Sequence, residues 1–427
     1  MTRRTMKVGM LARVEGEGGM HVEVRDGRVE QVRLNIFEPP RFFEALLRGR
    51  DHSEAPDITA RICGICPVAY QMSACLAMED TFGIEVPEPI RLMRRLLYCG
   101  EWIESHALHV FFLHAPDFLG FDGGIEMARE HRGVVEAALR IKHAGNQLMS
   151  VVGGRSVHPV NVKVGGFHRM PTMVELTGIR PELVAARHDL LDLVPLLAGF
   201  DFPDLEQPHM YFSLGAEHGY PLESGSLVTS AGLHAPVSSF GEHVVEEHVE
   251  HSNALHARFD GANYVVGPLA RYSLHSGSLS SLAAEVARAA GLGPTCRNPF
   301  RSILVRTVEL VYALDEAVRI IDEWDGGPAS VPVDVRAGVG HGATEAPRGL
   351  LYHRYRIDDD GSILDAWIVP PTSQNQPSVE EDLRLFVQDR LDLPQEELTL
   401  QCETAIRNYD PCISCATHFL DLTVHHR

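Results

Sequence analysis

Two Cys-x-x-Cys pairs stand near opposite ends of this 427-residue chain, Cys63 with Cys66 and Cys412 with Cys415. Thiolates three residues apart on a turn can point at one metal, and thiolate is the soft ligand that favours zinc, copper(I), nickel or iron. One such pair is weak evidence, whereas two pairs supply four ligands. Because most of the chain separates the pairs, a single site built from both would tie its two ends together.

A closed structural zinc site is the alternative interpretation of the same four cysteines. Zinc ribbons usually place their pairs about 15–20 residues apart, far closer than the pairs in this chain. The remaining cysteines are too scattered for a disulfide scaffold and form no ferredoxin pattern. These are Cys75, Cys99, Cys296 and Cys402.

Composition and charge exclude several classes of partner. The formal net charge of -20 would repel nucleic acid and anionic membrane surfaces at long range. We expect no membrane insertion, because no run of about 18 apolar residues occurs and the first residues lack an export signal. We therefore expect a cytoplasmic protein, or one exported only on a partner's signal. No glycine-rich dinucleotide fingerprint follows a predicted strand.

Hydrophobic periodicity predicts an α+β fold that is predominantly α, with residues 1–427 forming a single domain. Alternating apolar residues over 7–37 predict an N-terminal antiparallel meander, and residues 352–357 and 363–369 predict a hairpin in the C-terminal half. The rest is expected to be a large helical body. Helical spacing predicts helices over roughly 65–83, 89–113, 124–149, 173–197, 278–292, 298–324 and 377–391.

The residues around the two cysteine pairs carry a resemblance. The stretches 61–66, Arg-Ile-Cys-Gly-Ile-Cys, and 410–418, Asp-Pro-Cys-Ile-Ser-Cys-Ala-Thr-His, resemble the signature motifs of nickel-iron hydrogenase large, catalytic subunits. The similarity extends from Arg13 to His418. It implies reversible oxidation of H2 at a Ni-Fe centre whose iron carries cyanide and carbon monoxide. By position, Cys63 and Cys412 would be terminal nickel ligands, whereas Cys66 and Cys415 would also bridge to the iron.

Splitting H2 into hydride and proton requires a Lewis acid beside a base in a dry cavity, and the resemblance supplies candidate wall residues. Arg348, which follows Pro347 in the segment 345–349, matches an arginine held over the open metal positions. Asp117 and Asp410 match acidic residues that hold this arginine. Glu15 matches a glutamate that takes the proton from a terminal cysteine. Taken singly, these residues could equally be surface or helix-cap residues.

Two further groups of residues match ligand-binding positions of the family. Thr372 and Ser373 lie where a hydroxyl and backbone amides hydrogen-bond a cyanide ligand; they could also cap the helix that follows, and both roles are compatible. Glu44 and His418 match ligands of a second, octahedral metal, usually Mg²⁺. In the family, a maturation protease cuts after this histidine, so residues 419–427 are expected to be a maturation tail.

Two groups of histidines have helical spacing. Those at positions 106, 109 and 114 lie in a segment that resembles a structural and proton-path region of the family. The second group accompanies many acidic residues, and we interpret it as a solvated face of a helix rather than a metal site. It comprises His243, His248, His251 and His256.

One departure from the family pattern suggests a branch and its partners. Tyr70 stands where many members carry histidine, and with the missing export signal this resembles the soluble, bidirectional NAD(P)-linked branch, or sulfhydrogenases. Expected partners are an iron-sulfur small subunit, further iron-sulfur electron-transfer and flavin- and NAD(P)-binding subunits, a maturation protease and a nickel chaperone. The alternatives are a complex I-like electron-transfer scaffold, which has lost the metal cysteines, and a zinc-stabilised assembly protein.

Overall fold

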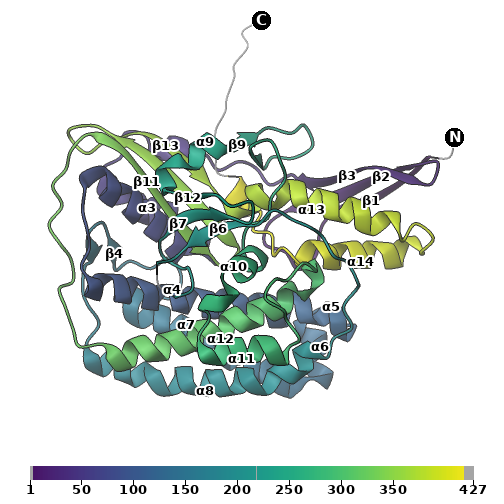
Figure 1. The fold of residues 1–427 in the computed structure, drawn as a ribbon, viewed down its shortest axis with the longest axis horizontal. Coiled ribbons are helices and arrows are strands. Elements are labelled where there is room, and N and C mark those ends of the chain that lie inside the picture. Colours follow the sequence, from purple (N-terminus) through teal and green to yellow (C-terminus); the bar gives the residue numbers. More distant parts are fainter. Residues whose placement is uncertain (1–2, 218, 418–427) are drawn as a thin grey trace, which may run out of the picture.

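Four long helices form the main body of the computed structural model, which describes residues 3–217 and 219–417. They are α4 (Glu88–Leu108), α7 (Arg132–Gly153), α8 (Met173–Ala198) and α12 (Ser302–Glu323), which pack against one another in a bundle (Figure 1). Helix α8 begins at a capping box in which Thr172 accepts from the amide of Glu175, while the Glu175 side chain accepts from the amide of Thr172. The apolar faces of these helices supply much of the hydrophobic core.

A three-stranded antiparallel sheet covers helix α3 (Pro67–Phe82), in the order β11 (Gly338–Ala346), β12 (Gly349–Ile357) and β13 (Ile363–Val369). Glycines on β11 permit this close packing: a Cβ at Gly342 would lie 2.2 Å from the Ser73 carbonyl oxygen, and one at Gly340 2.0 Å from that of Ala77. Because α3 follows Cys66 and β11 precedes Arg348, this contact fixes two predicted site segments relative to each other.

The N-terminal strands form a second antiparallel sheet, β1 (Arg3–Val8), β2 (Gly18–Arg25) and β3 (Arg28–Ile36), beside helices α13 (Pro371–Gln388) and α14 (Gln395–Arg407). Asp26 and Gly27 both have positive φ angles and make the tight turn between β2 and β3. The purple N-terminal and yellow C-terminal segments therefore lie side by side in Figure 1.

Shorter elements complete the fold. The remaining helices are α1 (Phe43–Leu47), α2 (Ala55–Thr59), α5 (Ala115–Leu119), α6 (Gly124–Glu130), α9 (Phe240–His243), α10 (Pro268–His275) and α11 (Ser281–Ala289), with a π-helical segment (His109–His114) after α4. The remaining strands are β4 (Val162–Lys163), β5 (Gly166–Phe167), β6 (Phe212–Gly215), β7 (Ser226–Thr229), β8 (His234–Ala235), β9 (Val244–Glu247) and β10 (His256–Phe259). Among the described residues, no helix has both the length and the apolar character needed to cross a membrane.

The predicted fold class, α+β and predominantly α, is confirmed, and so is the N-terminal meander. The C-terminal hairpin is the β12–β13 pair, but β11 extends it to three strands. The predicted helix over 124–149 is two helices separated at His131, and α13 begins six residues before its predicted start. The helix inferred from the second histidine group is wrong, because residues 244–247 and 256–259 pair as antiparallel strands.

Candidate metal centre

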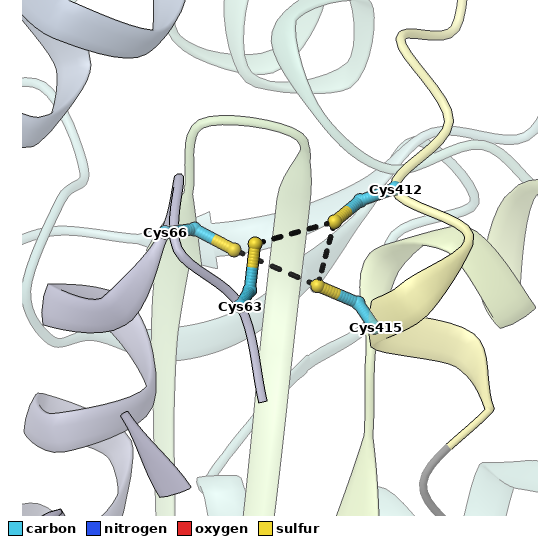
Figure 2. A group of neighbouring side chains, drawn as sticks. All are labelled: Cys63, Cys66, Cys412 and Cys415. Carbon is cyan, nitrogen blue, oxygen red and sulfur yellow. Dashed lines mark hydrogen bonds between the residues drawn. The ribbon is translucent and has the colours of Figure 1, made fainter. Parts of the chain in front are cut away.

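The four cysteines of the two pairs converge at one buried point (Figure 2). The Sγ atoms of Cys63 and Cys412 lie 3.4 Å apart, those of Cys66 and Cys415 3.7 Å, and those of Cys412 and Cys415 2.8 Å. All four are free thiols. Sulfur atoms bound tetrahedrally to one metal at 2.3 Å would be about 3.8 Å apart, so the arrangement already approaches a metal site.

Local backbone structure presents the thiols from two directions. Cys66 is the N-cap of α3, and Cys63 lies in the turn that leads into it. Cys412 follows α14 and pairs with Glu15 in a parallel bridge, while Cys415 lies in a 3-10 turn, Ser414–Ala416. Asp410 has a φ of 50°, a left-handed conformation that is uncommon outside glycine and marks a sharp turn two residues before Cys412.

The thiols need a cation to ionise together. Burial raises the pKa of Cys412 and of Cys415, whereas hydrogen bonds from neighbouring thiols, foremost Cys412, lower the pKa of Cys63 well below its usual value. Protons are thus shared unequally within the quartet. Because a metal binds the thiolate form, a bound cation would displace the remaining protons.

Arg348 and Asp410 form one wall beside the thiols. Nε of Arg348 donates to the backbone oxygen of Asp410 at 2.9 Å, and Nη2 donates to Oδ1 at 3.2 Å. Burial lowers the pKa of Arg348, but the charges of Asp410 and the nearby cysteines raise it well above its usual value. Among the described residues, Nη1 of this buried side chain has no hydrogen-bond partner. A permanently charged donor therefore remains available beside the thiols.

The expectation that Asp117 holds Arg348 is corrected by the structure. Oδ2 of Asp117 accepts from Nε of Arg407 at 2.7 Å, Oδ1 accepts from its Nη2 at 2.8 Å, and Arg13 donates to the same carboxylate. Nη1 of Arg407 donates to the carbonyl oxygen of Ala12 at 2.7 Å. Asp117 therefore links α5 to α14 and to the segment before Glu15. It stabilises the position of Glu15 without contacting Arg348. Short sequence motifs could not predict this pairing, because the long side chains of Arg13 and Arg407 come to Asp117 from distant parts of the chain.

Glu15 lies directly against a thiol of the quartet. Its Oε2 atom is 3.2 Å from Sγ of Cys412 and accepts from the amide of Ser414 at 3.0 Å. The amide of Ile413 donates to the Glu15 carbonyl oxygen at 3.0 Å, so the backbone holds the two segments together as well. The half-buried carboxyl group is thus placed to exchange a proton with Cys412.

The two hydroxyl residues at the start of α13 face different partners. Oγ1 of Thr372 accepts from the amide of Cys412 at 2.9 Å, so it lies beside the cysteine loop. The hydroxyl of Ser373 instead donates to Oε1 of Glu246 at 3.0 Å. The structure therefore brings Thr372 to the candidate centre, whereas the side chain of Ser373 is engaged with a residue that sequence reasoning did not single out.

Glu44 lines a separate cleft. Its Oε1 atom accepts from the amide of Ile368 at 2.8 Å, and its removal from water, reinforced by the charge of Glu246, raises the pKa of Glu44 to about 8. His418, the other predicted ligand of a second metal, and the predicted tail 419–427 lie outside the described residues. The second metal therefore stays a prediction.

Sequence reasoning missed the buried charges that support Pro347. Arg271 donates to Glu309 at 2.7 and 2.8 Å, to Glu345 at 2.9 Å, and through Nη2 to the Pro347 carbonyl oxygen at 3.0 Å. His106 lies 3.0 Å from the same Glu309 carboxylate. His106 and Glu309 lie in helices that the sequence predicted, but Arg271 lies on α10, which it did not predict, and Glu345 lies on β11. Their pairing depends on contacts between segments that are far apart in the chain.

Comparison with known proteins gives consistent matches over most of the chain. A family model described as nickel-dependent hydrogenase matches residues 41–126 and 237–418. The alpha subunit of sulfhydrogenase 1 from Pyrococcus furiosus is 33% identical over 418 residues, covering 96% of this chain and 97% of that protein. The alpha subunit of sulfhydrogenase 2 from the same organism is 33% identical over 426 residues, covering 96% and 98%.

A solved structure extends the comparison to three dimensions. The structure of an NAD+-reducing [NiFe]-hydrogenase in the H2-reduced state matches with a TM-score of 0.87 at 26% sequence identity. The match covers 97% of this chain and 99% of that chain. The similarity in three dimensions therefore extends over nearly the whole chain.

Proposed function

Because the chain belongs to the nickel-dependent hydrogenase family, we propose that it is the catalytic large subunit of a nickel-iron hydrogenase, which oxidises H2 reversibly to two protons and two electrons. One observation carries the proposal. Four buried thiols from opposite ends of the chain meet at one point, with an arginine on one side and a carboxyl group on the other.

The residues present fit a Ni-Fe centre. Four soft, anionic donors suit nickel and iron, and Nη1 of Arg348, which has no partner in the described part of the chain, offers a cation beside an anionic cluster. Cys63 and Cys412 would hold nickel terminally, while Cys66 and Cys415 would also bridge to the iron. When bound, the centre supplies the Lewis acid that polarises H2 and accepts its electrons.

The cyanide and carbon monoxide ligands of the iron also find partners in this proposal. The hydroxyl of Thr372 accepts from the Cys412 amide and can still donate its own proton to an anionic ligand. The backbone amides at the start of α13 add a positive dipole end there. Ser373 would contribute its backbone amide, because its hydroxyl donates to Glu246.

Proton movement follows from the contact between Cys412 and Glu15. Sγ of Cys412 would accept the proton released from H2 and pass it across 3.2 Å to Oε2 of Glu15. The Arg348 guanidinium, held by Asp410, would orient and polarise H2 beside the thiols. Asp117 keeps Arg13 and Arg407 in place and thereby fixes the segment that carries Glu15.

Electrons would leave through partner subunits. Within residues 3–217 and 219–417, the quartet is the one cysteine cluster with ligand geometry. We therefore propose an iron-sulfur small subunit, with flavin- and NAD(P)-binding and iron-sulfur electron-transfer subunits beyond it. The similarity to sulfhydrogenase alpha subunits and to an NAD+-reducing hydrogenase supports this choice. A nickel chaperone, a maturation protease acting after His418, Mg²⁺ at Glu44, and a cytoplasmic location complete the proposal.

The decisive experiment is elemental analysis of the purified native complex with an infrared scan for cyanide and carbonyl stretches. We expect about one nickel per large subunit, both infrared bands, and iron in excess of nickel, because the iron-sulfur partner subunits carry iron as well. Cys412→Ser should remove nickel, whereas Cys402→Ser, which changes a buried thiol outside the quartet, should retain it. Glu15→Gln should keep metals and bands but lower turnover by about 10²–10⁴-fold. Zinc in place of nickel, without the bands, would establish an assembly protein, and iron without nickel, zinc or the bands would establish an electron-transfer scaffold.

A further inference from the structure

A second group of metal-ligating side chains lies outside the cysteine quartet. His251, His256 and Glu380 each offer one ligand atom, and these atoms lie within 4.8 Å of one another. His251 belongs to the loop between β9 and β10, His256 begins β10, and Glu380 lies on α13. The two imidazole rings are 5.5 Å apart and nearly perpendicular, and Nε2 of His251 is 2.7 Å from Oε1 of Glu380.

An unsatisfied imidazole points to a missing ligand at this group. His256 is only 2% exposed, and its Nε2 atom is buried without a hydrogen-bond partner among residues 3–217 and 219–417. Leaving a buried polar atom unpaired costs about 1–3 kcal/mol. Most buried polar side-chain atoms have a partner, so this atom calls for a specific explanation.

We propose that His251, His256 and Glu380 bind one divalent cation of the zinc type, with water as the fourth ligand. Two imidazoles and one carboxylate are a common zinc ligand set. In a tetrahedral site with bonds of 2.0–2.1 Å, ligand atoms lie about 3.3 Å apart, so small side-chain rotations suffice. Binding requires an unprotonated Nε2 atom on His251, so the contact between His251 and Glu380 would be replaced by bonds from both residues to the ion. This inference does not depend on the proposed Ni-Fe chemistry.

The position of the site gives the ion a structural role. The loop between the two histidines carries Ala254, which is 1% exposed and packs with Ile36, Ile413 and Ala416 in one buried cluster. Ile413 lies between Cys412 and Cys415 in the sequence, and Ala416 directly follows Cys415. The amide of Asn253 also donates to the Ile36 carbonyl oxygen at 2.7 Å.

An ion bound at both ends of this loop would fasten it to α13. Oε1 of Glu380 also accepts from the amide of Leu34 at 2.8 Å, so β3 would be tied to the same point. The ion would thereby hold the loop against the segment that carries Cys412 and Cys415. It would act as a clasp on the metal centre, without contact with the reacting atoms.

The test is zinc analysis of the purified complex after equilibration with Zn²⁺ and removal of loosely bound metal. We expect His256→Ala and Glu380→Gln each to lose one zinc per large subunit relative to the unmodified complex, with nickel and iron unchanged. Glu380→Gln keeps an oxygen to accept from Leu34, so it separates loss of charge from loss of that hydrogen bond. His248→Ala, an exposed histidine in the same loop, is the matched control and should retain all the zinc.

X-ray absorption at the zinc edge identifies the ligands. We expect nitrogen and oxygen neighbours at about 2.0–2.1 Å and no sulfur at about 2.3 Å. Equal zinc in the complex, the control and both variants, or a sulfur shell, would overturn the clasp. Nickel content and the infrared bands report the Ni-Fe centre separately, so failure of one proposal is distinguishable from failure of the other. If His256→Ala does not assemble, the zinc content of Glu380→Gln decides.

Discussion

Two fully buried arginines near the candidate centre differ in how their donors are used. Arg271 directs Nε and both Nη atoms at Glu309, Glu345 and the carbonyl oxygens of residues 346 and 347. Arg348 bonds through Nε and Nη2 to Asp410, but among the described residues its Nη1 has no partner. A saturated buried charge stabilises a framework, whereas an unsaturated one is left to meet a ligand.

The saturated network also separates the charges of its two carboxylates. Although burial opposes ionisation, Arg271 and His106 lower the pKa of Glu309 to about 2. Burial raises the pKa of Glu345 to about 7, with a smaller contribution from the neighbouring Glu309 charge. Arg271 therefore has one permanently charged partner and one that titrates near neutrality. Because it also holds the Pro347 carbonyl oxygen, this network fixes the turn from which Arg348 projects.

Breaking the saturated network should produce the largest change. Arg271→Met leaves Glu309 and Glu345 buried without their cation, which should cost about 3–5 kcal/mol of stability. The measurement is the thermal midpoint of the assembled complex, with Arg384→Met, at an exposed pair with Glu381, as the control that should shift little. Equal shifts for the two variants would mean that the Arg271 network does not stabilise the framework.

Changing the unsaturated arginine should affect turnover rather than stability. Arg348→Lys keeps the charge but loses the planar guanidinium. Its Nε and Nη2 atoms bind Asp410, and its third nitrogen is left to bind a ligand. We expect H2 oxidation to fall by about 10²–10³-fold, which corresponds to about 2.7–4 kcal/mol of lost transition-state stabilisation. Nickel content, infrared bands and the thermal midpoint should stay near those of the unmodified complex. Full activity in this variant would remove Arg348 from the proposed mechanism.

The contrast also explains what the sequence could predict. The quartet was predictable because each Cys-x-x-Cys pair is local and its flanking residues are distinctive, and Glu15 and Arg348 were found by matching short segments. The partners of Asp117 were not, because Arg13 and Arg407 are far from it in the chain. Most long helices were visible from their apolar spacing, but β11 was missed because the glycines that fit it against α3 weaken the strand pattern.

The second histidine group shows the limit of local spacing. Residues 243–256 are acidic and histidine-rich, which suggested one face of a solvated helix, yet β9 and β10 pair as a hairpin. Spacing within this segment cannot reveal that Glu380, on a distant helix, completes a ligand set with His251 and His256. Long-range packing, rather than sequence pattern, creates that group.

Glu246 is a half-buried acidic residue whose two donors are neutral, and its substitution should give the smallest change in stability. Its donors, Nε1 of Trp367 and Oγ of Ser373, are both 3.0 Å away and neutral, and removal from water raises the pKa of Glu246 to about 7. The folded state therefore keeps a proton that the unfolded chain releases near pH 4.5. Stability from this group is complete below that pH and is lost as pH rises through about 7. Glu246→Gln cannot ionise and should not lose this stability. The difference between its thermal midpoint and that of the unmodified complex should therefore become more favourable to the variant from about pH 5 to pH 8. If the two midpoint curves run parallel with pH, the two neutral donors already stabilise the ionised Glu246. A carboxylate removed from water in this fold would then not need a cation such as the one that Arg271 supplies to Glu309.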